Sequence, residues 1–158
     1  RIGGNSHEVM FLDVADVNCD DREDIVVATQ QAEILLFMRE ENSQQPVWKL
    51  DVVPAPYGLL KGKAVAVGDL DLDGLLDIVH STEPNLGPRR PGVTWLKNLN
   101  HEGSQKELEF EVKQMSSLTG KKFDLLQCID VDHDGDLDVI TCEERDNLGL
   151  FWYENPHR

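Results

Sequence analysis

A nine-residue acidic loop occurs three times in this chain, and each copy leads directly into a β-branched run. The copies are DVNCDDRED at 16–24, DLDLDGLLD at 69–77 and DVDHDGDLD at 130–138, here called the first, second and third loop. The runs that follow, IVVAT, IVHST and VITCE, are typical of buried β-strands. A strand-to-strand loop written three times restricts the chain to a repeated β architecture.

Acidic side chains alternate along each loop in the way that a calcium site requires. Hard divalent cations prefer several oxygen ligands, and alternate residues of a tight loop can point at one centre. Side chains at positions 1, 3, 5 and 9 and the backbone carbonyl of position 7 make up the expected set. The expected ligands are Asp16, Asn18, Asp20, Arg22 and Asp24 in the first loop, Asp69, Asp71, Asp73, Leu75 and Asp77 in the second, and Asp130, Asp132, Asp134, Asp136 and Asp138 in the third, with Arg22, Leu75 and Asp136 acting through their carbonyl oxygens. The sequence therefore predicts up to three Ca²⁺ ions.

The first loop departs from the pattern at two positions. Asn18 replaces a carboxylate, and Asp21 stands where Gly74 and Gly135 permit the positive φ of a sharp turn. Aspartate tolerates the left-handed region better than most residues, but a lower ligand charge weakens calcium binding. We expect the site at 16–24 to bind calcium most weakly.

Solvated turns and helical calcium motifs fit these loops less well. Clustered acids can be a solvated turn, but such turns do not recur three times with one internal spacing. An EF-hand requires a bidentate glutamate at position 12 and flanking helices, whereas position 12 is Val27, His80 and Thr141. A dockerin-type repeat would also continue into helices, at a shorter period.

The spacing of the loops predicts an all-β fold, a β-propeller with three four-stranded blades. The loops begin at 16, 69 and 130, and intervals of 53 and 61 residues suit one blade each with long connections. The expected strands are 9–17, 24–30, 33–40 and 47–53, then 63–70, 76–82, 92–100 and 108–115, then 123–131, 137–143 and 148–156, so that a fourth strand is visible only in the first two units. We expect a single domain at 1–158 with repeats at approximately 1–53, 54–115 and 116–158.

The chain resembles the FG-GAP or VCBS family of calcium-binding β-propeller repeats, which also form the heads of integrin α-subunits. The resemblance rests on the DxDxDGxxD loops, the strand pairs around them and the WxxN segments at 95–98 and 152–155, and it covers nearly the whole chain. It implies that the ions sit in the hairpin between the first two strands of each blade, on one face of the disc.

Three blades are fewer than a closed propeller contains. Such rings close with about four to eight blades, so an arc of three would leave both end blades uncovered. We expect either a partial propeller that docks onto the missing blades of a larger chain or a homodimer that forms one closed ring. The segment RIGG at 1–4 resembles the tail of an outer strand, and the N-terminus of a neighbour would complete the third blade by strand addition.

Charged residues gather at the strand ends opposite the loops. Lysines and acids around a central depression could bind a sugar, a carboxylate or a peptide, or they could form a solvated rim of mutual salt bridges. The candidate ligand-binding residues are His7, Glu8, Lys61, Lys63, Glu83, Lys121, Lys122, Glu143, Glu144 and Arg145. No GxSxG elbow, HExxH helix or phosphate-binding glycine loop is present, and we assign no catalytic residue.

Composition limits the partners and the compartment. The 158 residues carry a formal charge of −15, which disfavours nucleic acid and anionic membrane surfaces as partners. No apolar run approaches the roughly 20 residues of a membrane-inserted helix. Calcium affinities on the order of 10⁻⁴ to 10⁻³ M are usual for extracellular modules, so we expect an extracellular or periplasmic location.

These inferences converge on a binding module with structural calcium. We expect a calcium-stabilised β-propeller that binds a carbohydrate or protein ligand on the face opposite the loops. The alternative is a carbohydrate-active enzyme of the polysaccharide lyase or sugar dehydratase type, or a segment of one, because some of those enzymes use similar propellers. A third hypothesis is an architectural repeat inside a larger assembly, which would show neither ligand binding nor turnover.

Overall fold

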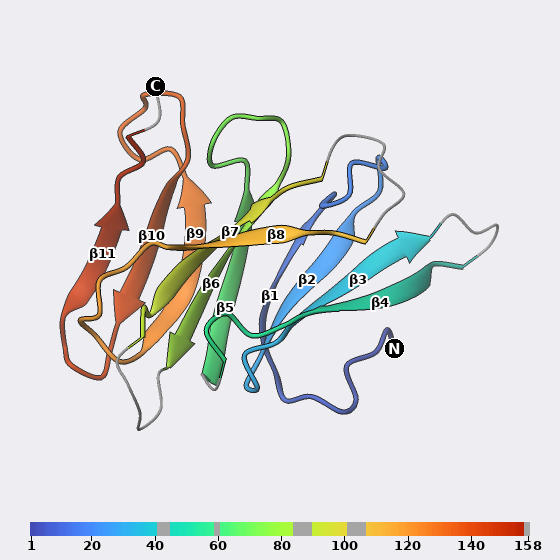
Figure 1. Ribbon diagram of the computed structural model, residues 1–158, viewed down its shortest axis with the longest axis horizontal. Helices are drawn as coiled ribbons and strands as arrows, with labels where there is room; N and C mark the ends of the chain where they lie inside the picture. The colour runs from blue at the N-terminus through green and yellow to red at the C-terminus, as the bar shows by residue number, and fades with distance from the viewer. Residues whose placement is uncertain (41–44, 59–60, 84–89, 101–106, 157–158) are drawn as a thin grey trace.

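The computed structural model of this chain is all-β and describes residues 1–40, 45–58, 61–83, 90–100 and 107–156 (Figure 1). Its strands are β1 (Val9–Ala15), β2 (Asp24–Thr29), β3 (Ile34–Glu40), β4 (Val47–Val53), β5 (Lys61–Gly68), β6 (Asp77–Glu83), β7 (Val93–Asn98), β8 (Phe110–Gln114), β9 (Phe123–Ile129), β10 (Asp138–Glu143) and β11 (Gly149–Tyr153). None of the described residues forms a helix that is long and apolar enough to cross a membrane.

The strands form three antiparallel sheets in which chain neighbours are also spatial neighbours. The first sheet has the order β1-β2-β3-β4, the second β5-β6-β7-β8 and the third β9-β10-β11. The expectation of an all-β chain is confirmed. The expected four-stranded unit occurs twice in the described parts of the chain, and the third sheet has three strands rather than four.

Burial along the strands follows their place in this arrangement. Strands β2 and β6, each the second strand of its sheet, are buried along nearly their whole length. Strands β4 and β8 lie at sheet edges and alternate between exposed and half-buried residues. The second strands are covered on both faces, although β6 also buries polar side chains such as His80 and Thr82, whereas the edge strands are covered mainly on one face.

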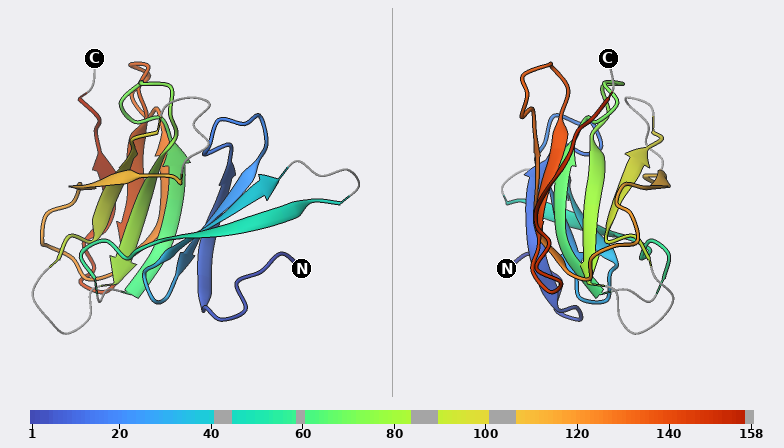
Figure 2. Two further views of the ribbon diagram at one scale, coloured as in Figure 1. Left: turned by 45° about the vertical axis from the view of Figure 1, so that its right-hand side comes forward. Right: turned by 90° about the vertical axis from the view of Figure 1, so that its left-hand side faces the viewer.

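The sheets lie side by side and pack through their faces (Figure 2). One apolar core joins the first and second sheets and includes Val17, Leu36, Ile78 and Leu96. A second core joins the second and third sheets and includes Ala66, Val79, Phe123 and Val139. The first strands of the sheets contact one another in the order β1, β5, β9, which places the three acidic loops at the same end of the molecule, at the top of Figure 1.

A glycine lets the first two sheets approach closely at the other end. A Cβ atom on Gly62 would lie 2.2 Å from the carbonyl oxygen of Thr29 and 3.0 Å from Nε2 of His80. His80 is completely buried there. No residue other than glycine fits this position without moving the backbone of the first sheet.

Candidate metal centres

The first aspartate of each loop accepts hydrogen bonds from backbone N–H groups later in the same loop. The carboxylate of Asp69 accepts hydrogen bonds from the backbone N–H groups of Asp73 at 3.1 Å and Gly74 at 2.9 Å. Asp16 and Asp130 make the same two bonds to the fifth and sixth residues of their own loops. The three loops therefore share one hydrogen-bonded frame, although their sequences differ.

The backbone of the frame contains left-handed residues at loop positions 4 and 6. At position 6, Gly74 has a φ of 88° and Gly135 a φ of 101°, while Asp21 adopts a φ of 63°. Aspartate adopts this left-handed conformation at a modest cost because its short polar side chain can form hydrogen bonds with nearby backbone groups. The first loop thus reaches the same shape without glycine.

The ninth residue of each loop is a buried aspartate that joins the loop to two strands. Asp77 accepts hydrogen bonds from the N–H groups of Leu70 at 3.2 Å and Asn98 at 2.8 Å. Asp24 and Asp138 are bonded in the same way, to position 2 of their own loops and to the end of the third strand. The ninth residue therefore hydrogen-bonds each acidic loop to the third strand of its sheet, independently of any bound ion.

Burial changes how readily these aspartates carry charge. It raises the pKa of Asp24 and of Asp77 to about 6. In Asp138 burial also acts to raise the pKa, but the N–H bonds from Asn155 and Val131 outweigh it and the pKa is lowered. A divalent cation beside a desolvated carboxylate would favour its charged form, so a metal ion fits the electrostatics of this position.

Two of the loops bring three carboxylates together. One ligand oxygen from each of Asp69, Asp71 and Asp77 lies within 4.8 Å of the others, and Asp130, Asp132 and Asp138 form the equivalent group. These are positions 1, 3 and 9 of the second and third loops, and both groups could hold a metal ion. In the part of the chain that the structure describes, the first loop forms no such group of acids, and its position 3 is the neutral Asn18.

Unpaired oxygens support the same interpretation. Asp136 is 2% exposed, and neither of its carboxylate oxygens has a hydrogen-bond partner among the described residues. Oδ1 of Asp71 is likewise buried without a partner there. A buried, unpaired carboxylate oxygen is costly, and a cation in the loop would offset that cost. The sequence predicted only the carbonyl of Asp136 as a ligand, because positions 22 and 75 offer no carboxylate.

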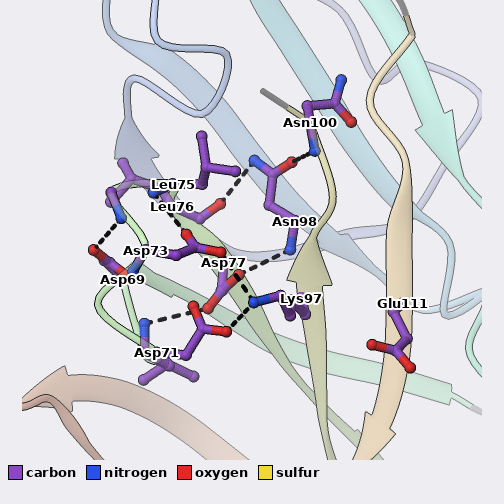
Figure 3. A network of polar contacts seen from close by, with 12 residues as sticks. Asp69, Asp71, Asp73, Leu75, Leu76, Asp77, Lys97, Asn98, Asn100 and Glu111 are labelled. Atoms are coloured by element: carbon purple, nitrogen blue, oxygen red, sulfur yellow. Dashed lines mark hydrogen bonds and ion pairs between the residues drawn. The ribbon is translucent and has the colours of Figure 1, made fainter. Parts of the chain in front are cut away.

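Lys97 was not anticipated and changes the second centre (Figure 3). Its ammonium group binds Oδ2 of Asp71 and lies 2.9 Å from Oδ2 of Asp73. Hydrogen bonds to these two carboxylates raise the pKa of Lys97, that to Asp71 most strongly. The residues at the equivalent strand position are Met38 and Glu154. The second loop therefore faces a built-in cation, whereas Met38 and Glu154 bring none to the other two loops from this strand position.

The predicted ligand face is partly brought together by the fold. Lys63 lies 3.8 Å from Glu83 and 3.6 Å from Asp124, a residue that the sequence did not single out. Five of the ten candidates and Asp124 form one cluster of ion pairs, here called the charged network. Its members are Lys63, Glu83, Lys122, Asp124, Glu144 and Arg145. The network spans the second and third sheets, and its charges are paired with one another.

The remaining candidates lie outside the network. His7 pairs with Glu33 at 3.1 Å in the first sheet, and Lys121 pairs with Asp146 at 2.7 Å. Lys61 opposes Glu83 across β5 and β6, and the backbone carbonyl of Glu8 accepts the N–H of Gln30.

Glu143 has a structural role at the turn that follows β10. Its carboxylate accepts backbone N–H groups from Lys121, just before β9, and from Asp146 and Leu148 in the turn between β10 and β11. Burial acts to raise the pKa of Glu143, but these N–H bonds outweigh it and the pKa is lowered. The side chain is therefore committed to holding the turn.

Comparisons with known proteins gave no match, so a functional assignment has to rest on the geometry of the acidic loops. Neither a family model nor a curated protein matches this chain. The chain offers the repeated loop frame, two acid triads, and buried carboxylate oxygens of Asp71 and Asp136 that have no hydrogen-bond partner among the described residues.

Proposed function

We propose that this chain is a calcium-binding module of the FG-GAP or VCBS β-propeller type, in which metal ions fasten strand pairs together. The observation that carries the proposal is the convergence of positions 1, 3 and 9 in two loops that share one hydrogen-bonded frame. Each loop joins the first two strands of its sheet. An ion there would offset the repulsion between carboxylates that the hairpin forces together, so binding and hairpin order would stabilise each other.

Calcium fits the donor set better than other common metals. The candidate ligands are all oxygens, which argues against zinc or copper sites built on imidazole or thiolate. A loop with several carboxylates and a backbone carbonyl can supply the six to eight ligands of Ca²⁺, whereas Mg²⁺ demands a stricter octahedron and retains water. We therefore expect calcium selectivity, with affinities on the order of 10⁻⁴ to 10⁻³ M and a calcium-rich, extracellular or periplasmic setting.

We assign ligand recognition to the charged network, on the face away from the loops. Its three cations and three carboxylates offer a sugar both donors and acceptors, and Lys63 and Glu83 are largely buried at 13% and 11% side-chain exposure. A carbohydrate or protein ligand would have to replace some of the existing ion pairs with its own polar contacts. Binding should therefore weaken in Lys122→Ala and leave calcium binding unchanged, which a glycan or peptide array followed by titration can measure.

The calcium proposal is tested by removing one carboxylate per site. Asp71→Asn and Asp132→Asn convert position 3 of the second and third loops to the residue that the first loop already has, Asn18. Asp51→Asn, which alters a surface pair with Lys49, is the matched control for the lost charge. Calorimetric titration with Ca²⁺ and with Mg²⁺ should show that each loop variant loses one calcium site and that the control loses none.

Thermal unfolding gives an independent measure of calcium binding, because a bound ion stabilises the folded chain. At about 5 mM calcium, an excess over the expected affinity, each occupied site should add about 1–2 kcal/mol to the free energy of unfolding relative to chelator. If both loop variants bind calcium and respond to it as the original chain does, the loops are not the calcium sites and the proposal fails.

A further inference from the structure

The first loop has the backbone shape of the other two loops but satisfies its oxygens differently. Its frame is complete, because Asp16 accepts the N–H groups of Asp20 at 2.9 Å and Asp21 at 2.7 Å. Its half-buried and buried residues leave no buried side-chain oxygen without a hydrogen-bond partner in the described structure, in contrast to Asp71 and Asp136. The acceptors of this loop are therefore supplied with donors by the chain itself.

Position 3 of the first loop uses its side chain inside the loop. The amide oxygen of Asn18 accepts the backbone N–H of Asp20 at 3.1 Å, and its amide nitrogen donates to Oδ2 of Asp20 at 3.2 Å. In the second loop, position 3 is Asp71, whose Oδ1 is buried without a partner among the described residues. Asn18 thus directs an N–H donor, not a free oxygen, at the position-5 carboxylate, which is the opposite of what a metal ligand requires.

Position 7 of the first loop supplies a positive charge. The guanidinium of Arg22 donates to the backbone carbonyl of Asp20 at 3.2 Å, and it lies 3.2 Å from Oδ2 of the same residue. The side chains of Arg22 and Asp20 are 32% and 31% exposed, so this ion pair is partly shielded from water. Position 7 of the other loops is Leu75 or Asp136. The first loop therefore carries its own cation beside a carboxylate that the sequence predicted as a metal ligand.

The equivalent carboxylate oxygen also receives a cation of the chain in the second loop. In both loops Oδ1 of position 5 accepts the N–H of position 7, with Arg22 bonded to Asp20 at 3.0 Å and Leu75 bonded to Asp73 at 3.0 Å. The other oxygen of Asp73 lies 2.9 Å from the ammonium of Lys97. Two side chains from different elements, one in the loop and one on the third strand, thus reach the same point of the shared frame, which marks it as a place where the frame needs positive charge.

We propose that the guanidinium of Arg22, together with the amide of Asn18, takes the place of a metal ion in the first loop, so that this loop keeps its shape without calcium and binds none. The inference rests on the proposed calcium function of the other two loops, and it assigns two calcium sites to the chain instead of two and a weak third. A guanidinium is permanently charged and covalently attached, whereas an ion bound at 10⁻⁴ to 10⁻³ M, the order of magnitude expected here, leaves when calcium is low. The hairpin of β1 and β2 therefore stays ordered in chelator, while the hairpins of the other two sheets loosen.

A gain of a third site tests the role of Arg22. The double variant Asn18→Asp, Asp21→Gly restores the acid of position 3 and the glycine of position 6 without changing the formal charge of the loop, and a triple variant adds Arg22→Leu, the residue of the second loop. Calorimetric titration with Ca²⁺ should give two sites for the original chain and three for the triple variant. The double variant keeps the guanidinium and should bind a third ion about tenfold more weakly than the triple variant, because the ion has to displace a charge-assisted bond.

Hydrogen exchange tests the same role without a bound ion. In the original chain, the amides of β6 and β10 should gain protection when calcium is added, whereas those of β2 should be equally protected in calcium and in chelator. Arg22→Gln keeps a polar side chain but removes the charge, and it should lower the protection of β1 and β2 severalfold under both conditions. Lys49→Gln, which removes the charge of an exposed pair with Asp51 on β4, is the matched control and should leave β1 and β2 unchanged.

Four outcomes would overturn the inference. They are three calcium ions bound by the original chain, equal affinity of the double and triple variants for a third ion, protection of β2 by calcium to the extent seen in β6, and an Arg22→Gln variant that exchanges like the Lys49→Gln control. Loss of calcium binding by the second and third loops is a separate result, which would refute the proposed function. The role of Arg22 would then be decided by the exchange of β1 and β2 in chelator.

Discussion

The side-chain amide of Asn98 donates a hydrogen bond to the backbone carbonyl of Val17, 3.2 Å away and 81 positions earlier in the chain. Asn98 also donates its backbone N–H to the buried carboxylate of Asp77. One residue thus connects the second loop to the first loop on the neighbouring sheet. Asn155 repeats both contacts, to Leu70 and Asp138, so the metal centres and the contacts between sheets are coupled.

Replacing Asn98 with alanine should loosen that connection. The variant loses the hydrogen bonds that the amide donates to the carbonyls of Val17 and Leu76, and the one that it accepts from the N–H of Asn100. We expect the free energy of unfolding to fall by about 1–3 kcal/mol in urea denaturation, whereas Asn5→Ala, an exposed position, should change little. An Asn98→Ala variant as stable as the Asn5 control would show that the contact does not tie the sheets together.

Replacing Lys97 with methionine, the residue at the equivalent position 38, should strengthen calcium binding at the second loop. The ammonium of Lys97 competes for oxygens of Asp71 and Asp73, so an entering ion has to break charge-assisted bonds. We expect the dissociation constant of this site to fall by roughly tenfold, which corresponds to the strength of one such bond. Calorimetry should also show that the third site is unaffected; an unchanged second site would mean that Lys97 does not compete.

The buried His80 should make stability fall in mild acid. Its ring is 0% exposed, neither nitrogen has a hydrogen-bond partner among the described residues, and burial lowers its pKa to about 4. Because the unfolded chain has a histidine pKa of about 6.5, it binds more protons than the folded chain as the pH drops from there to about 4. The stability contributed by neutral His80 is therefore present above that window and is lost within it, by up to about 3 kcal/mol.

A His80→Val variant isolates this effect. Valine is the residue at the equivalent position 27, and it removes the titrating group. Asp24 and Asp77, whose pKa values burial raises to about 6, act in the opposite direction in chelator, but they are common to both proteins and cancel in the difference. The stability advantage of the variant should grow as the pH falls from about 6.5 to about 4; a constant difference would show that the ring does not stay neutral.

Lys63→Met should destabilise the interface between the second and third sheets. The side chains of Lys63, Glu83 and Asp124 are 13%, 11% and 21% exposed, so removing the lysine leaves two largely desolvated acids with fewer counter-charges. We expect the free energy of unfolding to fall by about 2 kcal/mol, a value between those typical of exposed and of buried ion pairs. Lys49→Met, which removes an exposed pair with Asp51, is the control. Equal losses in urea denaturation would show that the network contributes no more than a surface pair.

The acidic loops and the strands around them could be predicted from the sequence because both depend on patterns within a few residues. Ligands at positions 1, 3 and 9 lie within nine residues of one another, so their spacing determines whether they can converge once the flanking runs pair as strands. The strand runs are equally local, since alternation and β-branching report on burial of each strand. The neutral side chain at position 3 of the first loop, Asn18, could be read directly from the sequence.

Contacts between sheets depend on how the three sheets stack, and only the tertiary structure decided them. Within the second sheet, the ion pairs of Lys97 with Asp71 and Asp73 likewise span 26 and 24 positions, and no periodic pattern places a third-strand lysine over a loop. Asp124 enters the charged network because faces of different sheets meet there. The amino-acid order by itself determined the loops and the strands around them, because hydrogen bonds and side-chain periodicity act over a few residues. The packing of one sheet on the next decided which charges are neutralised and which histidine is buried.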